Sequence, residues 1–461
     1  MASGVAPGDR LQLEITSLAT EGDGVGRTGD FAVFVPRTAP GDRVEVEVTE
    51  SHASYARARL RRLLVSSPLR ASAPCAVYES CGGCTWQHLA YAAQLEWKRT
   101  LVVEALRRIG HVAEPEALVA PTLAADPPWR YRHKMAVPFA LEGGRPVAGF
   151  YANRSHRIVP FLNCPIQHPA LDAVLASVRR QVSRLHVSLH DPRTGHGDLR
   201  HLVARVSCST GKVLACLVTA RPAFPQGVDM ADQLMREVPA VIGVVQNVQG
   251  APGNAILGRQ TRLLRGSDHL TEELDGLHFE VSAPSFFQVS PAQAARLYMV
   301  AVQQAALTSG QNAFDLYAGV GTLSLFLARS GATVEAVEEV PDAIRDGRRN
   351  LALNRDVSLG PVRFHLGQAE SALPQLLASG RHPDAVVLDP PRRGASAGVL
   401  SCIAEVHPPR IVYVSCNPAT LARDIEILTT RGYVLREVQP VDMFPQTAHV
   451  EAAALLVREH A

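Results

Sequence analysis

Three short apolar runs in the C-terminal part of the chain end in residues that suit ligand binding or chemistry. The runs at 313–318, 384–389 and 411–416 lead into a Gly-Val-Gly loop, an acid before two prolines, and a cysteine before Asn-Pro. Helical patterns fill the gaps, and strands that alternate with helices predict a parallel, doubly wound α/β sheet. The carboxyl ends of such strands gather ligands and reactive groups. The thiol of Cys416 is therefore a candidate nucleophile.

The remainder of the chain divides into two further parts. Residues 8–65 alternate apolar and polar positions between glycine-rich turns, which predicts a small β-barrel. A Ser/Pro/Ala-rich linker follows, then a predicted helix at 91–109 and mainly strands from 130 to 280. We expect a barrel over 1–66, a central β-rich unit over 67–285 and the α/β unit over 286–461. Strands of the last unit are predicted at 313–318, 333–338, 362–366, 384–389, 411–416, 433–441 and 449–457.

Charge is local in this chain. The net charge is only +2, so no global field argues for nucleic acid, but residues 51–70 contain five arginines and no acidic residue. We find neither a signal peptide nor an apolar run long enough to span a bilayer. We therefore expect a cytoplasmic protein without membrane contact, whose eight cysteines stay reduced.

The glycine loop at 319–321 is typical of a nucleoside site. Glycines let a backbone turn tightly and approach a ligand, and Glu338, at the end of the next strand, can bind ribose hydroxyls. The alternative is an ordinary strand–helix turn with Glu338 on the surface. Leu323 and Ser324 break the Gly-x-Gly-x-x-Gly pattern of dinucleotide sites. This departure favours S-adenosylmethionine over NAD.

The acid–proline turn and the thiol complete the predicted site. Two prolines make the turn after Asp389 rigid, so that Asp389 and Arg392 can be held over the cofactor cleft. A helix predicted at 420–428 would favour the Cys416 thiolate through its N-terminus. If the last two strands form an antiparallel hairpin, Glu451 can lie across from Cys416. A thiolate and a carboxylate base suit conjugate addition to a pyrimidine, alkylation and proton removal.

The other cysteines fall into two groups. Cys75, Cys81 and Cys84 form a C-x5-C-x2-C pattern, with Cys164 as the expected fourth ligand. Four thiolates suit zinc or an iron–sulfur cluster, and the spacing alone does not choose between them. The remaining three thiols are expected to be structural, as most buried cysteines are: Cys208, Cys216 and Cys402.

Candidate RNA contacts come from basic residues. Arg130, Arg132 and Lys134 alternate along a predicted strand, which would place them on one face. Together with Arg57 and Arg59 they could follow phosphates. A solvated strand face explains each residue equally well. Arg392, beside the cleft, is a further candidate.

Five motifs in order resemble the RNA uracil-5 methyltransferase family. They are Ser-Phe-Phe-Gln-Val at 285–289, the loop at 315–321, Asp-Pro-Pro-Arg at 389–392, Ser-Cys-Asn-Pro at 415–418 and His-Val-Glu at 449–451. The resemblance covers essentially the whole chain and includes a TRAM RNA-binding barrel at 8–65. It implies that Cys416 attacks uracil C6 and that Glu451 removes the C5 proton after methylation. Implied contacts to S-adenosylmethionine are Gln288, Tyr317, Glu338 and Asp389, with Gln368 near adenine and Thr322 where such proteins often have Asn.

The subgroup that the chain resembles carries a 4Fe-4S cluster at its four cysteines. The barrel and the cysteine pattern favour 23S rRNA as substrate, and tRNA is the alternative on the same fold. A non-catalytic RNA-binding or ribosome-assembly factor is the alternative of another class, against which Cys416 and Glu451 argue. We infer no obligate protein partner, and the sequence does not indicate the modified uridine or the oligomeric state.

Overall fold

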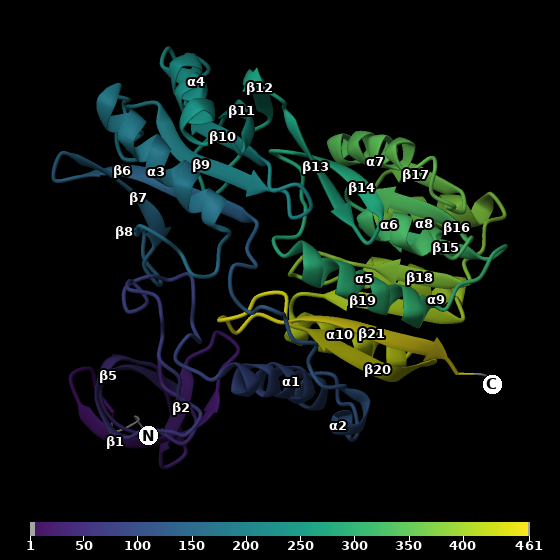
Figure 1. The fold of residues 1–461 in the computed structure, drawn as a ribbon. Helices are drawn as coiled ribbons and strands as arrows, with labels where there is room; N and C mark the ends of the chain where they lie inside the picture. The colour runs from purple at the N-terminus through teal and green to yellow at the C-terminus, as the bar shows by residue number, and fades with distance from the viewer. Residues whose placement is uncertain (1–4, 460–461) are drawn as a thin grey trace.

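The computed structural model describes residues 5–459. Figure 1 shows the N-terminal barrel, a central sheet above it, and the C-terminal sheet with its helices beside both. Within the described residues, no helix is both long and apolar enough to cross a membrane.

The N-terminal strands close into the predicted barrel, in the order β1-β2-β3-β5-β4. Val44, Val46 and Val48 point inward with the alternate residues of the other strands, because side chains alternate across a strand. Pairing of β4 with β1 completes the closure and leaves no free edge. The strands are β1 (Arg10–Leu18), β2 (Gly24–Thr28), β3 (Phe31–Val35), β4 (Arg43–Ser51) and β5 (Tyr55–Val65).

The central part is a mixed seven-stranded sheet of order β12-β11-β10-β9-β6-β7-β8. The turn predicted around 207–212 does connect two antiparallel strands, β9 and β10. Helices α3 and α4 pack on this sheet, and β13 and β14 form a separate hairpin. The elements are α1 (Tyr91–Arg108), α2 (Pro115–Leu118), β6 (Lys134–Glu142), β7 (Arg145–Tyr151), β8 (Ile158–Pro160), α3 (Pro169–Arg184), β9 (Leu199–Val206), β10 (Val213–Thr219), α4 (Gly227–Glu237), β11 (Val241–Val248), β12 (Gln260–Gly266), β13 (His269–Leu274) and β14 (Leu277–Ser282).

The C-terminal sheet has the order β17-β16-β15-β18-β19-β21-β20, and its first five strands are parallel. All seven predicted strands are present, and the last two form an antiparallel hairpin, the condition for Glu451 to lie across from Cys416. The elements are α5 (Pro291–Ala305), β15 (Asn312–Leu316), α6 (Thr322–Ala328), β16 (Thr333–Glu338), α7 (Pro341–Leu353), β17 (Val362–Leu366), α8 (Ala369–Ala378), β18 (Ala385–Leu388), α9 (Ala397–Val406), β19 (Arg410–Ser415), α10 (Pro418–Thr429), β20 (Tyr433–Val441) and β21 (Glu451–Arg458).

Helix α1 packs against the C-terminal sheet although it precedes the central one in sequence. It lies beside α10 and β20, and its residues Val102, Val103 and Leu106 join the apolar core beneath β18 and β19. The polar side chains on this helix consequently reach the C-terminal part of the protein.

Candidate active site

The carboxyl ends of β15, β16 and β18 border a cleft of about 610 Å³. Most of the predicted cofactor residues line it: Gln288, Tyr317, Thr322, Glu338 and Asp389. Gln368 lies in an adjoining cavity of about 840 Å³, which shares Tyr317 and Glu338 with the first. The doubly wound topology therefore gathers all six side chains around one continuous region, as it does at strand ends in general.

The glycine loop is shaped by positive backbone angles. Tyr317, Gly319 and Gly321 have φ of 65°, 56° and 79°, a region that favours glycine and strains tyrosine. A Cβ atom on Gly321 would lie 2.7 Å from Cζ of Phe364, so this position also lacks space for a side chain. The Glu338 carboxylate accepts hydrogen bonds from the amides of Gly319 (2.9 Å) and Val340 (2.8 Å). Glu338 thus supports the loop as well as facing the cleft.

Buried carboxyl groups make the cleft suited to a cation. Burial raises the pKa of Asp315 to about 7, although Ser324 donates a hydrogen bond to it at 2.5 Å. Removal from water also raises the pKa of Asp389 to about 7. Near neutral pH each group can therefore ionise when a positive charge arrives.

Cys416 and Glu451 face each other at the end of neighbouring antiparallel strands. Ser415, the last residue of β19, pairs with Ala452 of β21, and Cys416 and Glu451 are the next residues beyond this last pair. Burial, followed by the negative charges of Glu451 and Asp389, raises the pKa of Cys416 to about 11. Burial likewise raises the pKa of Glu451 well above its usual value. Burial and these two negative charges thus oppose the thiolate that the N-terminus of α10 is expected to favour.

Arg392 opposes this protonation. Its charge lowers the pKa of both Cys416 and Glu451. Its carbonyl accepts hydrogen bonds from Asn417 Nδ2 (3.1 Å) and Thr420 Oγ1 (3.3 Å), which tie the acid–proline turn to the start of α10. The guanidinium lies 3.4 Å from Nδ1 of His449. A thiol, a buried carboxyl and a cation therefore meet beside an acidic cleft.

Comparisons with known proteins agree with this geometry. A family model described as tRNA (Uracil-5-)-methyltransferase matches residues 255–459, and the TRAM domain model matches residues 5–60. RNA methyltransferases of Halalkalibacterium halodurans and Listeria innocua are each 39% identical to the chain over 97% of both sequences. The chain belongs to the RNA uracil-5 methyltransferase family. It is an enzyme that uses S-adenosylmethionine and acts on RNA.

A solved structure supports the fold of the methyltransferase over its full length. The tRNA (uracil-54, C5)-methyltransferase of Pyrococcus abyssi, in complex with S-adenosyl-L-homocysteine, has a TM-score of 0.76 and 27% identity, with 97% of this chain and 100% of that chain covered. The predicted Rossmann-like unit and the predicted TRAM barrel are thereby confirmed.

The four predicted cluster cysteines of the methyltransferase line one small cavity, of about 80 Å³. Burial raises the pKa of Cys84 to about 12 and that of Cys164 to about 11. Among residues 5–459, no group of three or more His, Cys, Asp or Glu side chains is arranged to hold a metal ion. The thiols thus share a cavity without the close grouping that a single ion needs.

The expectation that Arg130, Arg132 and Lys134 share one strand face is wrong. Only Lys134 lies in β6, whereas Arg130 has a φ of 58° and Arg132 forms an isolated bridge to Gln167, so these three do not share a strand face. Lys134 is also half-buried, and burial lowers its pKa to about 8.

The arginines of β5 are largely paired. Arg59 donates to Glu47 at 2.8 Å, and Arg57 lies 3.3 Å from Asp23. The acids come from β4 and from the β1–β2 turn, so the local positive charge predicted at 51–70 is compensated in the fold. One of the predicted structural cysteines, Cys208, is exposed in the β9–β10 turn.

Sequence reasoning missed two residues that shape the cleft. Arg205 of β9 is buried and donates to the carbonyls of Ser285 (3.3 Å) and Phe287 (3.2 Å), which flank the loop carrying Gln288. Asp315 stands in a recognised motif, but nothing in the motif indicates a buried acid. Arg205 carries no motif at all, because its partners lie 80 and 82 residues away.

The buried acids predict a pH dependence for cofactor binding. Below pH 7 Asp315 and Asp389 are mostly neutral, and they ionise as the pH rises through 7. Affinity for the cationic cofactor should therefore rise up to about 10-fold from pH 6 to pH 8. Isothermal titration calorimetry at both pH values measures this. S-adenosylhomocysteine, which lacks the sulfonium charge, should show a smaller change, and an equal change for both ligands would contradict the explanation.

Proposed function

We propose that this enzyme methylates C5 of uridine in 23S rRNA in the cytoplasm, through a covalent adduct of Cys416. The observation that carries this proposal is the placement of Cys416 opposite Glu451, next to the acidic cleft. A half-buried thiol close to a buried carboxyl fits conjugate addition followed by proton removal.

The residues divide the reaction between them. The Cys416 sulfur, once deprotonated, adds to C6 of the uracil, and electron density moves onto C5. S-adenosylmethionine supplies the methyl group that C5 accepts. The Glu451 carboxylate then takes the C5 proton, and the bond between sulfur and C6 breaks to release the thiolate. Arg392 supports both steps, since its charge favours the ionised forms of Cys416 and Glu451.

The cofactor fits the acidic cleft and the glycine loop. Glu338 would hold the ribose, Gln368 would lie near the adenine, and Tyr317 and Thr322 would border the nucleoside. Gln288 and Asp389 would hold the amino-acid part, with the Asp389 carboxylate near the sulfonium. The assignment is supported by the placement of five of these residues in one cleft and of Gln368 in the adjoining cavity.

We propose that 1–66 binds RNA, that 67–285 carries the cluster and that 286–461 performs the chemistry. The candidate phosphate contacts remain Arg57, Arg59, Arg130, Arg132, Lys134 and Arg392. Of these, Arg59, Arg130 and Arg392 are exposed and suit that role best.

The P. abyssi relative acts on tRNA according to its name, so tRNA is the second candidate substrate. Methylation of transcribed 23S rRNA and tRNA, followed by mapping of 5-methyluridine, tests the choice. Product in tRNA alone would overturn the rRNA assignment.

We further propose that Cys75, Cys81, Cys84 and Cys164 hold a 4Fe-4S cluster. The observation that supports this proposal is that all four thiols line one cavity, and four thiolates suit an iron–sulfur cluster as well as zinc. Anaerobically purified protein is expected to contain iron and acid-labile sulfide in equal amounts, and Cys84→Ser should lose most of both. Cys208→Ser, at an exposed thiol, is the matched control. Zinc without sulfide in the wild-type protein would refute the cluster.

A further inference from the structure

The loop between β20 and β21 is where three parts of the chain meet. This loop, residues 442–450, ends at Glu451. The amides of Thr85 and Trp86, directly after Cys84, donate to the Gln446 carbonyl at 3.1 and 3.0 Å. The Trp86 indole in turn donates to the carbonyl of Gly22 in the barrel at 3.0 Å. The cysteine segment and the barrel are thus connected to the strand that carries Glu451.

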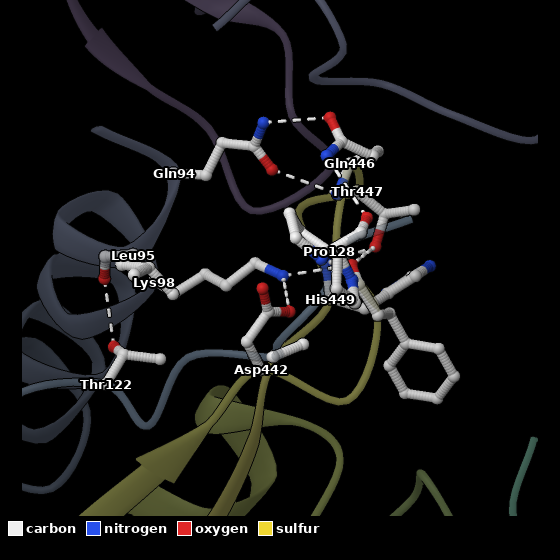
Figure 2. A network of polar contacts seen from close by, with 12 residues as sticks. Gln94, Leu95, Lys98, Thr122, Pro128, Asp442, Gln446, Thr447 and His449 are labelled. Carbon is white, nitrogen blue, oxygen red and sulfur yellow. Dashed lines mark hydrogen bonds and ion pairs between the residues drawn. The ribbon is translucent and has the colours of Figure 1, made fainter. Parts of the chain in front are cut away.

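A buried ion pair anchors the beginning of the loop. Lys98 of α1 and Asp442 have fully buried side chains that contact each other (Figure 2). The Lys98 ammonium also donates to the Phe444 carbonyl at 3.0 Å, and Tyr91 donates its hydroxyl to Asp442 at 2.8 Å. The carbonyl of Asp442 accepts from Gln293 of α5 at 2.9 Å. Asp442 is therefore held from both sides of the sheet.

A second set of contacts fixes the middle of the loop. Gln94, one turn before Lys98, donates through Nε2 to Gln446 Oε1 at 3.0 Å and accepts from the Gln446 amide at 2.9 Å. Figure 2 shows this exchange above the ion pair. Further along the loop, the Thr447 hydroxyl accepts a hydrogen bond from the backbone amide of His449. The imidazole ring of His449 lies beside the Arg392 guanidinium. The contacts form a continuous path from α1 to the cation beside Cys416.

Stability alone is a weak reason for this arrangement. Taking two charges out of water costs roughly what their attraction returns, and apolar residues of similar volume often replace a buried pair without loss. The pair instead fixes the conformation of the backbone. The Lys98 ammonium contacts both the Asp442 carboxylate and the Phe444 carbonyl, and these two contacts restrain the chain between them.

We propose that Lys98 and Asp442 are positioning residues, which hold the loop 442–450 in the form that keeps Glu451 opposite Cys416. Thr85 and Trp86 extend the same restraint to the cysteine segment. The inference rests on the proposed function for its kinetic consequence, because Glu451 is there the base that removes the C5 proton. Its structural consequence, an ordered loop, does not depend on that role.

The test is the double variant Lys98→Met/Asp442→Leu, which removes both charges together and avoids an unpaired buried charge. Hydrogen exchange of peptides covering 442–451 should become faster, while exchange in the barrel stays unchanged. With RNA labelled with tritium at uridine C5, kcat should fall about 10- to 100-fold with little change in KM for S-adenosylmethionine. Tritium release should also lag behind methyl incorporation, which a general loss of folded protein would not produce. Lys212→Met, at an exposed lysine, is the control for loss of a lysine charge.

Tyr91→Phe is the second variant, since it removes one hydroxyl from Asp442 and leaves both charges in place. Hydrogen exchange of 442–451 should become faster and kcat should fall, as in the double variant but by less. The expected fall in kcat is about 3-fold or more. Wild-type loop exchange in a folded double variant would overturn the proposal. So would an unfolded double variant combined with wild-type behaviour of Tyr91→Phe. If the wild-type enzyme does not methylate uridine, the proposed function fails, and loop exchange still decides whether the pair positions the loop.

Discussion

Replacing Cys416 with alanine is expected to abolish uridine methylation. The rate should fall by about 10⁴-fold or more, the scale of loss when an enzyme's nucleophile is removed, because no other thiol in the described residues faces Glu451. Cofactor binding should persist, since Asp389 and the glycine loop are untouched. Transfer of labelled methyl groups to RNA measures the first effect, and calorimetry with S-adenosylhomocysteine measures the second.

The control for this variant is Cys208→Ala, which removes an exposed thiol outside the cleft and should retain wild-type activity. RNA containing 5-fluorouridine provides an independent check. Its C5 carries fluorine in place of hydrogen, so no C5 proton is available for removal and the covalent adduct cannot break down. Wild-type protein should form a denaturation-resistant adduct with this RNA, and Cys416→Ala should not. Methylation by Cys416→Ala at an undiminished rate would rule out the thiol mechanism.

Glu451→Gln is expected to stop the reaction after methyl transfer. Loss of a positioned base typically costs about 10²- to 10⁴-fold in rate, and here the covalent RNA adduct should accumulate because its C5 proton stays in place. Burial raises the pKa of the Glu451 carboxyl and so favours its neutral form, and a neutral amide of the same shape should therefore leave the fold intact. Denaturing gels of enzyme with labelled RNA report the adduct directly.

The matched control is Glu437→Gln, on the neighbouring strand β20, where the carboxylate accepts a hydrogen bond from Gln304. This variant should turn over at the wild-type rate. If Glu451→Gln methylates RNA at the wild-type rate and no covalent adduct accumulates, another group removes the C5 proton. Unchanged thermal unfolding of both variants would show that the difference is chemical.

Much of the C-terminal fold was predictable because its signals are local. Apolar runs bounded by glycine, proline and acidic residues predict where each strand ends, and strand–helix alternation predicts a parallel sheet. The placement of Glu451 across from Cys416 was conditional on an antiparallel final hairpin, and the structure contains that hairpin. The barrel was equally accessible, because period-2 alternation is strong in β4.

The errors share a physical cause. The ionisation of Cys416 depends on how much water surrounds the thiol, and burial raises its pKa although a helix begins nearby. The cations expected on one strand face were displaced because the backbone turns at Arg130 before β6 begins. The arginines of β5 meet acids that pairing brings from β4. Each outcome depends on neighbours that the local sequence does not contain.

By itself the sequence determined the secondary structure, the order of the motifs and the chemical groups available: a thiol, a carboxylate and a glycine loop at strand ends. Tertiary structure decided which groups are charged and what holds them in place. Burial is the main cause that raises the pKa values of Asp315 and Asp389 to about 7. Lys98 meets Asp442 across 344 residues because α1 packs on the C-terminal sheet. Motifs consist of residues that are close together in the sequence. Desolvation and ion pairing arise from contacts between residues that are far apart in the sequence.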